Sequence, residues 1–195
     1  MYATHQPLIA AHARRGPSQL RDVLAFAAAT AHLHFAQVPA LMAEYHTGEL
    51  GSFQPNARDT ASADHRFLFD WATDVWAAPA SFTDTALLSE LARVRGLGPA
   101  KAGFAAQLLF GRVGCLDTHN LRAYGVTVPP RFDRCGATTR VARLADYCAT
   151  CAQLGSSAFL WDSWCASMAD RYPWDWGRAE LVSAAHVNCI LGEAA

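Results

Sequence analysis

The stretch Gly96-Leu-Gly-Pro-Ala-Lys-Ala102 decides the fold class of this chain, because it marks a sharp turn between two helices. Glycine lacks a Cβ atom, so it tolerates positive φ angles and lets another backbone approach closely. Apolar residues at helical spacing precede the turn, and Pro99 suits the first position of the helix that follows. The N–H groups at the start of that second helix can bind a phosphate. The sequence therefore predicts two helices joined by a tight turn with an anion-binding end.

Helical periodicity continues on both sides of this turn, and no alternating run is long enough for a β-sheet. We expect one all-α domain over residues 1–195. A first helix is expected to open near Ser18 and to be interrupted at Pro39, and residues 47–56 are expected to form a loop. Further helices are expected after His65, from Thr83 or Asp84, from Pro99 to near Gly111, and over 118–124, 138–154, 156–171 and 176–191.

A second motif, Asp117-Thr-His-Asn-Leu-Arg122, lies beyond the second of these two helices. Together, the turn and this motif, residues 96–122, resemble the helix-hairpin-helix DNA glycosylase superfamily. The resemblance implies a helical bundle with the hairpin and the catalytic segment at 84–125. It also implies that the hairpin grips the DNA backbone and that Asp117 faces the anomeric carbon of a flipped nucleotide.

A carboxylate is useful beside a glycosidic bond, because the departing base leaves an oxocarbenium-like sugar. A fixed negative charge stabilises that cation, and the same group can deprotonate the attacking water or amine. The nucleotide must be extruded from the duplex to reach such a group. Asp117 can also cap the helix expected over 118–124, and one carboxylate can serve both roles.

The resemblance also marks candidates around Asp117. Residues His119 and Asn120 would lie on the first turn of the helix after it, near the mouth of the pocket. His119 is a candidate catalytic residue, although a single histidine is commonly structural. Arg122 suits either an ion pair or a DNA contact. The expected DNA-binding residues are Gly96, Gly98, Ala100, Lys101, Asn120 and Arg122.

Lys101 is the only lysine of the chain, whereas every other fixed positive side chain is arginine. Lysine can lose its proton and attack carbon, which arginine cannot do. The bifunctional glycosylases use a lysine near this position to form a Schiff base with the sugar. Aligning the glycines puts Ala100 at that position and Lys101 one residue later, about 100° around the helix. Lys101 is therefore a catalytic amine, a phosphate contact or an exposed lysine.

Positive charge is concentrated around the turn. The whole chain has 16 Lys and Arg against 17 Asp and Glu. Residues 93–143 contain nine Lys and Arg and two Asp, a net charge of +7, and the remainder carries −8. Phosphate contacts by such residues would give salt-dependent, sequence-independent affinity for double-stranded DNA. A solvated arginine-rich surface would have the same composition.

Cofactors and membranes are not indicated by the sequence. Cys148-x-x-Cys151 is a metal-like spacing, but the gaps to Cys135 and Cys165 do not match the compact cysteine pattern of iron–sulfur glycosylases. We therefore expect buried free thiols, no metal and no cofactor. No signal peptide or apolar run of membrane-spanning length is evident. We expect a monomer in the cytoplasm, or in the host cytoplasm if the chain is phage-encoded.

Three functions fit the resemblance. The first is a DNA glycosylase that cleaves the N-glycosidic bond without lyase activity, since Ala100 holds the lysine position. The second is a base-modifying transferase, similar to relatives of phage origin predicted to be thymine pyrophosphorylases, which replace a pyrophosphate on the base by an amino acid or amine. The third is a non-catalytic DNA-binding or virion-associated protein. No motif identifies an aromatic residue that would fill the gap left by an extruded base.

Overall fold

The computed structural model describes residues 1–30, 35–117, 120–121, 125, 136–174 and 177–192. Every regular element in these ranges is helical, as the periodicity of the sequence predicts. In chain order the elements are α1 (Tyr2–Ala13), α2 (Pro17–Ala29), η1 (Phe35–Gln37), α3 (Val38–His46), α4 (Pro55–Ser62), α5 (Arg66–Ala77), η2 (Pro79–Ser81), α6 (Asp84–Leu91), α7 (Pro99–Phe110), α9 (Ala137–Leu154), α10 (Ser157–Arg171) and α11 (Ala179–Leu191).

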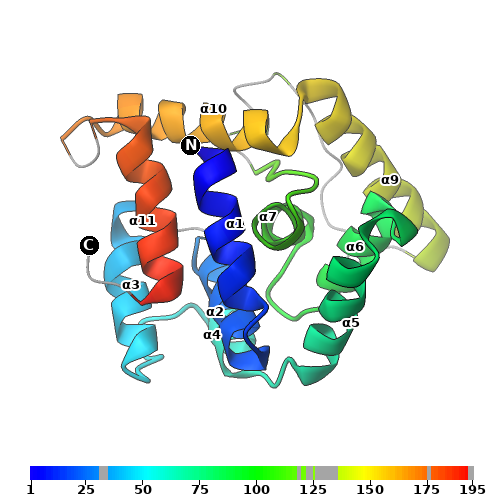
Figure 1. Ribbon diagram of the computed structural model, residues 1–195, viewed down its shortest axis with the longest axis horizontal. Helices are drawn as coiled ribbons and strands as arrows, with labels where there is room; N and C mark the ends of the chain where they lie inside the picture. Colours follow the sequence, from blue (N-terminus) through cyan, green and yellow to red (C-terminus); the bar gives the residue numbers. More distant parts are fainter. Residues whose placement is uncertain (31–34, 118–119, 122–124, 126–135, 175–176, 193–195) are drawn as a thin grey trace.

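Helix α7 lies at the centre, and Figure 1 shows it almost end-on with other helices around it. It packs against α1, α2 and α6. Every residue from Ala102 to Leu109 is buried, as expected for a helix that is apolar on all sides. The side-chain amide of Gln107 donates to the Ser157 carbonyl at 2.7 Å, so the one buried polar residue of α7 bridges it to α10.

The other helices form two groups beside α7. On one side, α11 packs against α1, α3 and α10, and on the other side α6 packs against α9 (Figure 1). Helix α4 packs against α2. Most of the buried apolar side chains of these helices belong to one cluster that extends from α1 to α11.

The helix boundaries around the central turn confirm the sequence signals. The Thr83 hydroxyl accepts a hydrogen bond from the Ala86 N–H at 3.2 Å and caps α6. Gly98 is the N-cap of α7 and Pro99 is its first residue. Gly111 ends α7 with φ +68°, in the left-handed region that favours glycine.

Three features differ from the expectations. Helix α1 was not expected, and Pro7 lies inside it. Helix α4 begins at Pro55, within the expected loop over 47–56. Pro39 is in the first turn of α3 and does not interrupt a helix. Proline lacks only the N–H that the first turn leaves without an intrahelical acceptor, so it opens a helix as readily as it breaks one.

The C-terminal helices lie close to their expected positions. The Ser156 hydroxyl accepts from the Phe159 N–H at 3.1 Å and caps α10. Helix α11 begins at Ala179, three residues later than expected. Of the helix expected over 118–124, only Asn120 and Leu121 are among the described residues. No helix in the described part of the chain is both long and apolar enough to cross a membrane.

Candidate active site at the Asp117 turn

The turn between α6 and α7 is built on Gly96. The Leu97 N–H donates to the Val94 carbonyl at 3.1 Å, and Gly96 has φ +93°. A Cβ atom on Gly96 would collide with the Asn56 carbonyl and the Thr60 hydroxyl of α4. The glycine is therefore required both by its φ angle and by the close approach of α4.

Gly98 differs from Gly96 in both respects. Its φ is −69°, and a Cβ atom there would meet no other atom within 4 Å. The first hydrogen bond of α7 runs from the Ala102 N–H to the Gly98 carbonyl at 2.8 Å, so the amides of Ala100 and Lys101 precede the helical ladder. The start of α7 is thus an open surface with amides positioned to meet an anion.

Asp117 begins a helical turn. Its Oδ1 atom accepts from the Asn120 N–H at 3.0 Å, and its carbonyl accepts from the Leu121 N–H at 2.9 Å. The predicted capping role of Asp117 is therefore confirmed. The hydrogen bond to Asn120 also fixes the orientation of the carboxylate.

Asn120 supports this turn from the inside. Asn120 is buried, and its side-chain amide donates a hydrogen bond to the Cys115 carbonyl. The amide is thus engaged with the backbone two residues before Asp117, and the expected contact of Asn120 with DNA stays a prediction. The neighbouring candidates His119 and Arg122 lie outside the described residues.

The Lys101 side chain runs inward along α7. Its ammonium group donates to the Thr30 hydroxyl at 2.9 Å, at the C-terminal end of α2, and lies 5.7 Å from the centre of the Phe104 ring. A cation is favourable both at a helix C-terminus and over an aromatic ring. Lys101 is therefore a half-buried group with protein partners, which favours neither a phosphate contact nor a freely exposed lysine.

The two motifs meet at Cys115. Burial raises the pKa of the Cys115 thiol to about 12, while the positive charge of Lys101 lowers this pKa and the negative charge of Asp117 raises it. The thiol thus lies within electrostatic range of both residues, which come from α7 and from the Asp117 turn. A thiol with this pKa is protonated at neutral pH and is not a nucleophile.

The Asp117 turn is held against α7 by Gly103 and Tyr147. A Cβ atom on Gly103 would collide with the Gly114 carbonyl and with the Tyr147 ring and hydroxyl. The Tyr147 hydroxyl donates to the Gly114 carbonyl at 2.9 Å and accepts from the Leu116 N–H at 2.8 Å. Burial raises the pKa of Tyr147 well above its ordinary value, so the hydroxyl stays protonated. These residues were not expected; a glycine inside an apolar helix was the available signal.

Several basic residues near the hairpin already have protein partners. Arg112 pairs with Asp84 at 2.7 Å and donates to two carbonyls of the segment that links α5 and α6. Arg140 donates to the Ala92 carbonyl at 2.9 Å. These two arginines connect elements of the fold, so the net charge of residues 93–143 overstates the charge available to DNA.

Arg93 and Arg95 are different, because their side chains are 71% and 80% exposed beside the turn. Arg93 pairs with Glu90 at 3.2 Å and Arg95 with Asp59 at 2.9 Å. Exposed pairs of this kind contribute little to stability and can exchange their carboxylates for a phosphate. Among the basic residues of the described hairpin, these two are the best placed to meet DNA.

The described cysteines form no metal site. Among the residues that the structure describes, no group of three or more His, Cys, Asp and Glu side chains is arranged to bind a metal ion. Burial raises the pKa of Cys148 to about 11 and that of Cys151 further, so neither is a ready thiolate ligand. Cys135 lies outside the described residues.

His186 provides a contrast on the other side of α7. It is fully buried, and its Nδ1–H donates to the Val182 carbonyl at 2.7 Å. Aromatic rings surround it, and burial lowers its pKa to about 3. The imidazole is therefore neutral, in agreement with a core histidine. The surrounding rings are Phe26, Phe104, Trp161 and Trp164.

Comparisons of the chain with protein-family models, with curated proteins and with solved structures gave no match.

Proposed function

We propose that this protein binds double-stranded DNA through the α6–α7 hairpin and acts on one extruded nucleotide through Asp117. The observation that carries the proposal is the convergence of two motifs that the sequence separates. Gly103 brings the backbone of residue 114 against α7, and Asp117 begins the turn that follows this backbone. The same helix, α7, also provides at its start the amides where a phosphate would bind.

The reaction that suits Asp117 best is cleavage of the N-glycosidic bond. The Asn120 N–H fixes one carboxylate oxygen, so the group is oriented before substrate binds. An oriented carboxylate stabilises the positive charge that develops on the sugar and can accept a proton from the attacking water. The nucleotide would be extruded into this position, because the duplex hides its sugar.

The surroundings of residues 100 and 101 favour a monofunctional enzyme. Ala100 has no nucleophile, and the Lys101 ammonium is engaged with Thr30 and Phe104. An ammonium group must lose its proton before it attacks carbon. The hydroxyl and the aromatic face both hold the Lys101 side chain within the fold.

A base-modifying transferase on the same fold is the second candidate. A transferase of this kind displaces a pyrophosphate, and the amides that precede the first hydrogen bond of α7 could hold such a group.

Incubation with duplexes that contain damaged or hypermodified bases separates these functions. Mass spectrometry of the base and of the strand is the measurement. We expect release of a free base with an intact strand. A mass gain on the nucleotide would identify a transferase, and tight binding without chemistry would identify a DNA-binding protein.

A further inference from the structure

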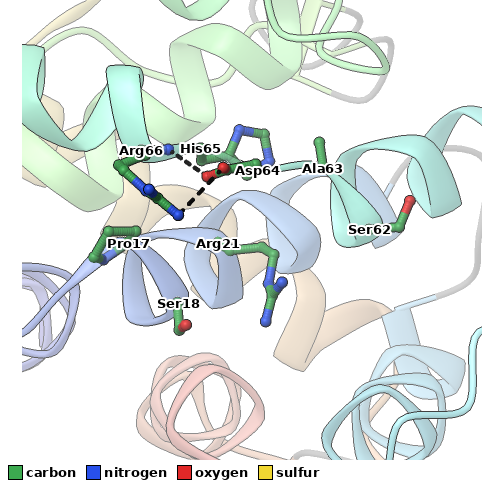
Figure 2. Close-up of a pocket in the computed structure, with 8 residues that line it drawn as sticks. All are labelled: Pro17, Ser18, Arg21, Ser62, Ala63, Asp64, His65 and Arg66. Carbon is green, nitrogen blue, oxygen red and sulfur yellow. Dashed lines mark hydrogen bonds and ion pairs between the residues drawn. The ribbon is translucent and has the colours of Figure 1, made fainter.

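A polar groove lies between the first turns of α2 and the segment that links α4 to α5. It has a volume of about 360 Å³. Of the eight described residues that line it, only Pro17 and Ala63 are apolar, and none is Phe, Tyr or Trp (Figure 2). The His65 ring is engaged elsewhere, since its Nε2–H donates to the Thr60 carbonyl at 2.8 Å. The lining therefore suits a small hydrophilic ligand better than one with a flat base.

Positive charge enters the groove from both walls. Arg21 comes from α2, and Arg66 is the first residue of α5. Asp64 is the one acidic residue of the lining. Burial lowers the pKa of His65, so its imidazole is neutral at pH 7. Two arginines against one aspartate give the lining a net charge of +1, which favours an anionic ligand.

The start of α2 adds hydrogen-bond donors to these charges. The N-cap of α2 is Gly16, which has no side chain to accept a hydrogen bond from the first amides. The first hydrogen bond of the helix runs from the Leu20 N–H to the Gly16 carbonyl at 3.0 Å, so the Ser18 N–H precedes the helical ladder. Ser18 lines the groove. Its amide and the helix dipole both favour an anion at this position.

Arg21 gives a second, independent indication of a ligand. Its Nε–H is buried, and no acceptor in the described part of the chain receives a hydrogen bond from it. A buried donor without an acceptor is costly to the fold. An anion in the groove that Arg21 lines would supply this acceptor.

Arg66 is only weakly held by its protein partner. Figure 2 shows Arg66 beside Asp64. The guanidinium is 3.6 Å from the Asp64 carboxylate, and the two side chains are 75% and 70% exposed. So exposed a pair contributes little. A ligand with more negative charge than Asp64 would therefore displace this carboxylate from the guanidinium.

We propose that this groove binds a small phosphate monoester, with the phosphate held by Arg21, Arg66 and the Ser18 N–H. A phosphate monoester carries a charge of about −1.5 to −2 at pH 7, which matches two arginines. The phosphodiester of a nucleic acid or of a lipid carries a single negative charge, and it is flanked by groups that a groove of this size does not admit. The inference goes beyond the proposed function and does not depend on DNA binding.

Isothermal titration calorimetry with glycerol 3-phosphate tests this site. The wild type should bind glycerol 3-phosphate, should bind the diester dimethyl phosphate more weakly, and should not bind glycerol. Arg66→Gln should weaken the binding of glycerol 3-phosphate about tenfold, because it removes a charged hydrogen-bond donor. Asp64→Asn should strengthen it about threefold, because it removes the competing carboxylate.

The two variants should fold normally. Both side chains are exposed, and asparagine keeps an oxygen for the hydrogen bond at 3.0 Å from the Arg66 N–H to Asp64. The melting temperature of each variant without ligand should therefore match that of the wild type.

Matched controls come from Asp170 and Arg171, two exposed residues of α10, which lies across the molecule from α4 (Figure 1). Asp170→Asn and Arg171→Gln make the same charge changes and should leave the affinity unchanged. If the wild type does not bind glycerol 3-phosphate, or if the groove variants behave like these controls, the inference is wrong. It is equally wrong if Arg66→Gln weakens the binding of a DNA duplex and not that of glycerol 3-phosphate. Failure of the hairpin to bind DNA would overturn the proposed function and leave this site standing.

Discussion

The His186 cluster and the Asp117 turn both place a titratable side chain against other parts of the protein. The two side chains differ in what surrounds them and in how far they are exposed to solvent. Around His186 the neighbours are rings, and the imidazole has lost its basicity. At the Asp117 turn the carboxylate accepts a hydrogen bond from the Asn120 N–H, and Asp117 remains partly accessible. Burial among rings makes His186 a neutral core group, whereas Asp117 is held by a hydrogen bond and stays partly open to solvent.

The contact of Gly103 with the backbone before Asp117 should be the part of the site most sensitive to substitution. Gly103→Val would force a side chain into the Gly114 carbonyl and Tyr147. We expect a loss of about 3 kcal/mol or more in the free energy of unfolding, since backbone atoms cannot move aside as a side chain can. Urea denaturation measures it. A loss below about 1 kcal/mol would show that α7 does not hold the turn in this way.

The His186 cluster should make the protein acid-sensitive. The pKa of His186 is lowered from 6.5 to about 3 in the folded state, so the unfolded chain binds the proton more readily below pH 6.5. Its contribution to stability is complete above pH 6.5 and is lost as the pH falls toward 3. The loss at pH 4 should be on the order of 3 kcal/mol.

Urea denaturation at several pH values checks this prediction. Burial also lowers the pKa of His65 and of His5, so these residues add to the same trend. His186→Phe keeps a ring in the cluster and should remove the largest part of the pH dependence. An unchanged profile in this variant would place the acid sensitivity elsewhere.

The two hairpin glycines should respond differently to the same substitution. Gly96→Ser places a side chain at φ +93° against α4 and should cost about 2 kcal/mol. Gly98→Ser should leave stability unchanged or slightly higher, because serine is a preferred N-cap and its Cβ would point into open space. Thermal melts compare the two. If Gly98→Ser also destabilises the fold, the start of α7 is not the open surface described above.

The smallest effect is expected from chemistry at Lys101. Borohydride should trap no covalent complex with DNA, because the Lys101 ammonium is hydrogen-bonded to Thr30 and lies against the Phe104 ring. The N-terminal amine and Lys101 are the two amines of the chain. Trapping that disappears in Lys101→Arg would show a Schiff base and a bifunctional enzyme.

The parts of the fold that sequence predicts best are those specified by adjacent residues. Thr83, Gly98 and Pro99 set helix ends through local hydrogen bonds and fixed φ angles, and the structure places the ends there. Helix α1 escaped prediction because its burial depends on distant helices, as in the bond from the Tyr2 hydroxyl to the Gln107 carbonyl at 2.9 Å.

The candidate site also combines features that local sequence predicts with features that depend on distant residues. The capping of Asp117 follows from local sequence, and the catalytic role of Asp117 stays a prediction. The partners that hold the turn were not predictable, since Tyr147 lies 33 residues from Gly114. The direction of Lys101 was not predictable either, because its long side chain reaches Thr30 at the end of another helix.

The most direct test of the role of Asp117 is the turnover of Asp117→Asn on a duplex that the wild type processes. Asparagine keeps the side-chain oxygen that caps the turn and removes only the charge. We predict a normal melting temperature, normal DNA affinity and turnover reduced by about 10²-fold or more. Asp170→Asn, an exposed carboxylate of α10, makes the same charge change away from the turn and should turn over normally. Unchanged turnover in a folded, DNA-binding Asp117→Asn variant would contradict the proposed role of Asp117.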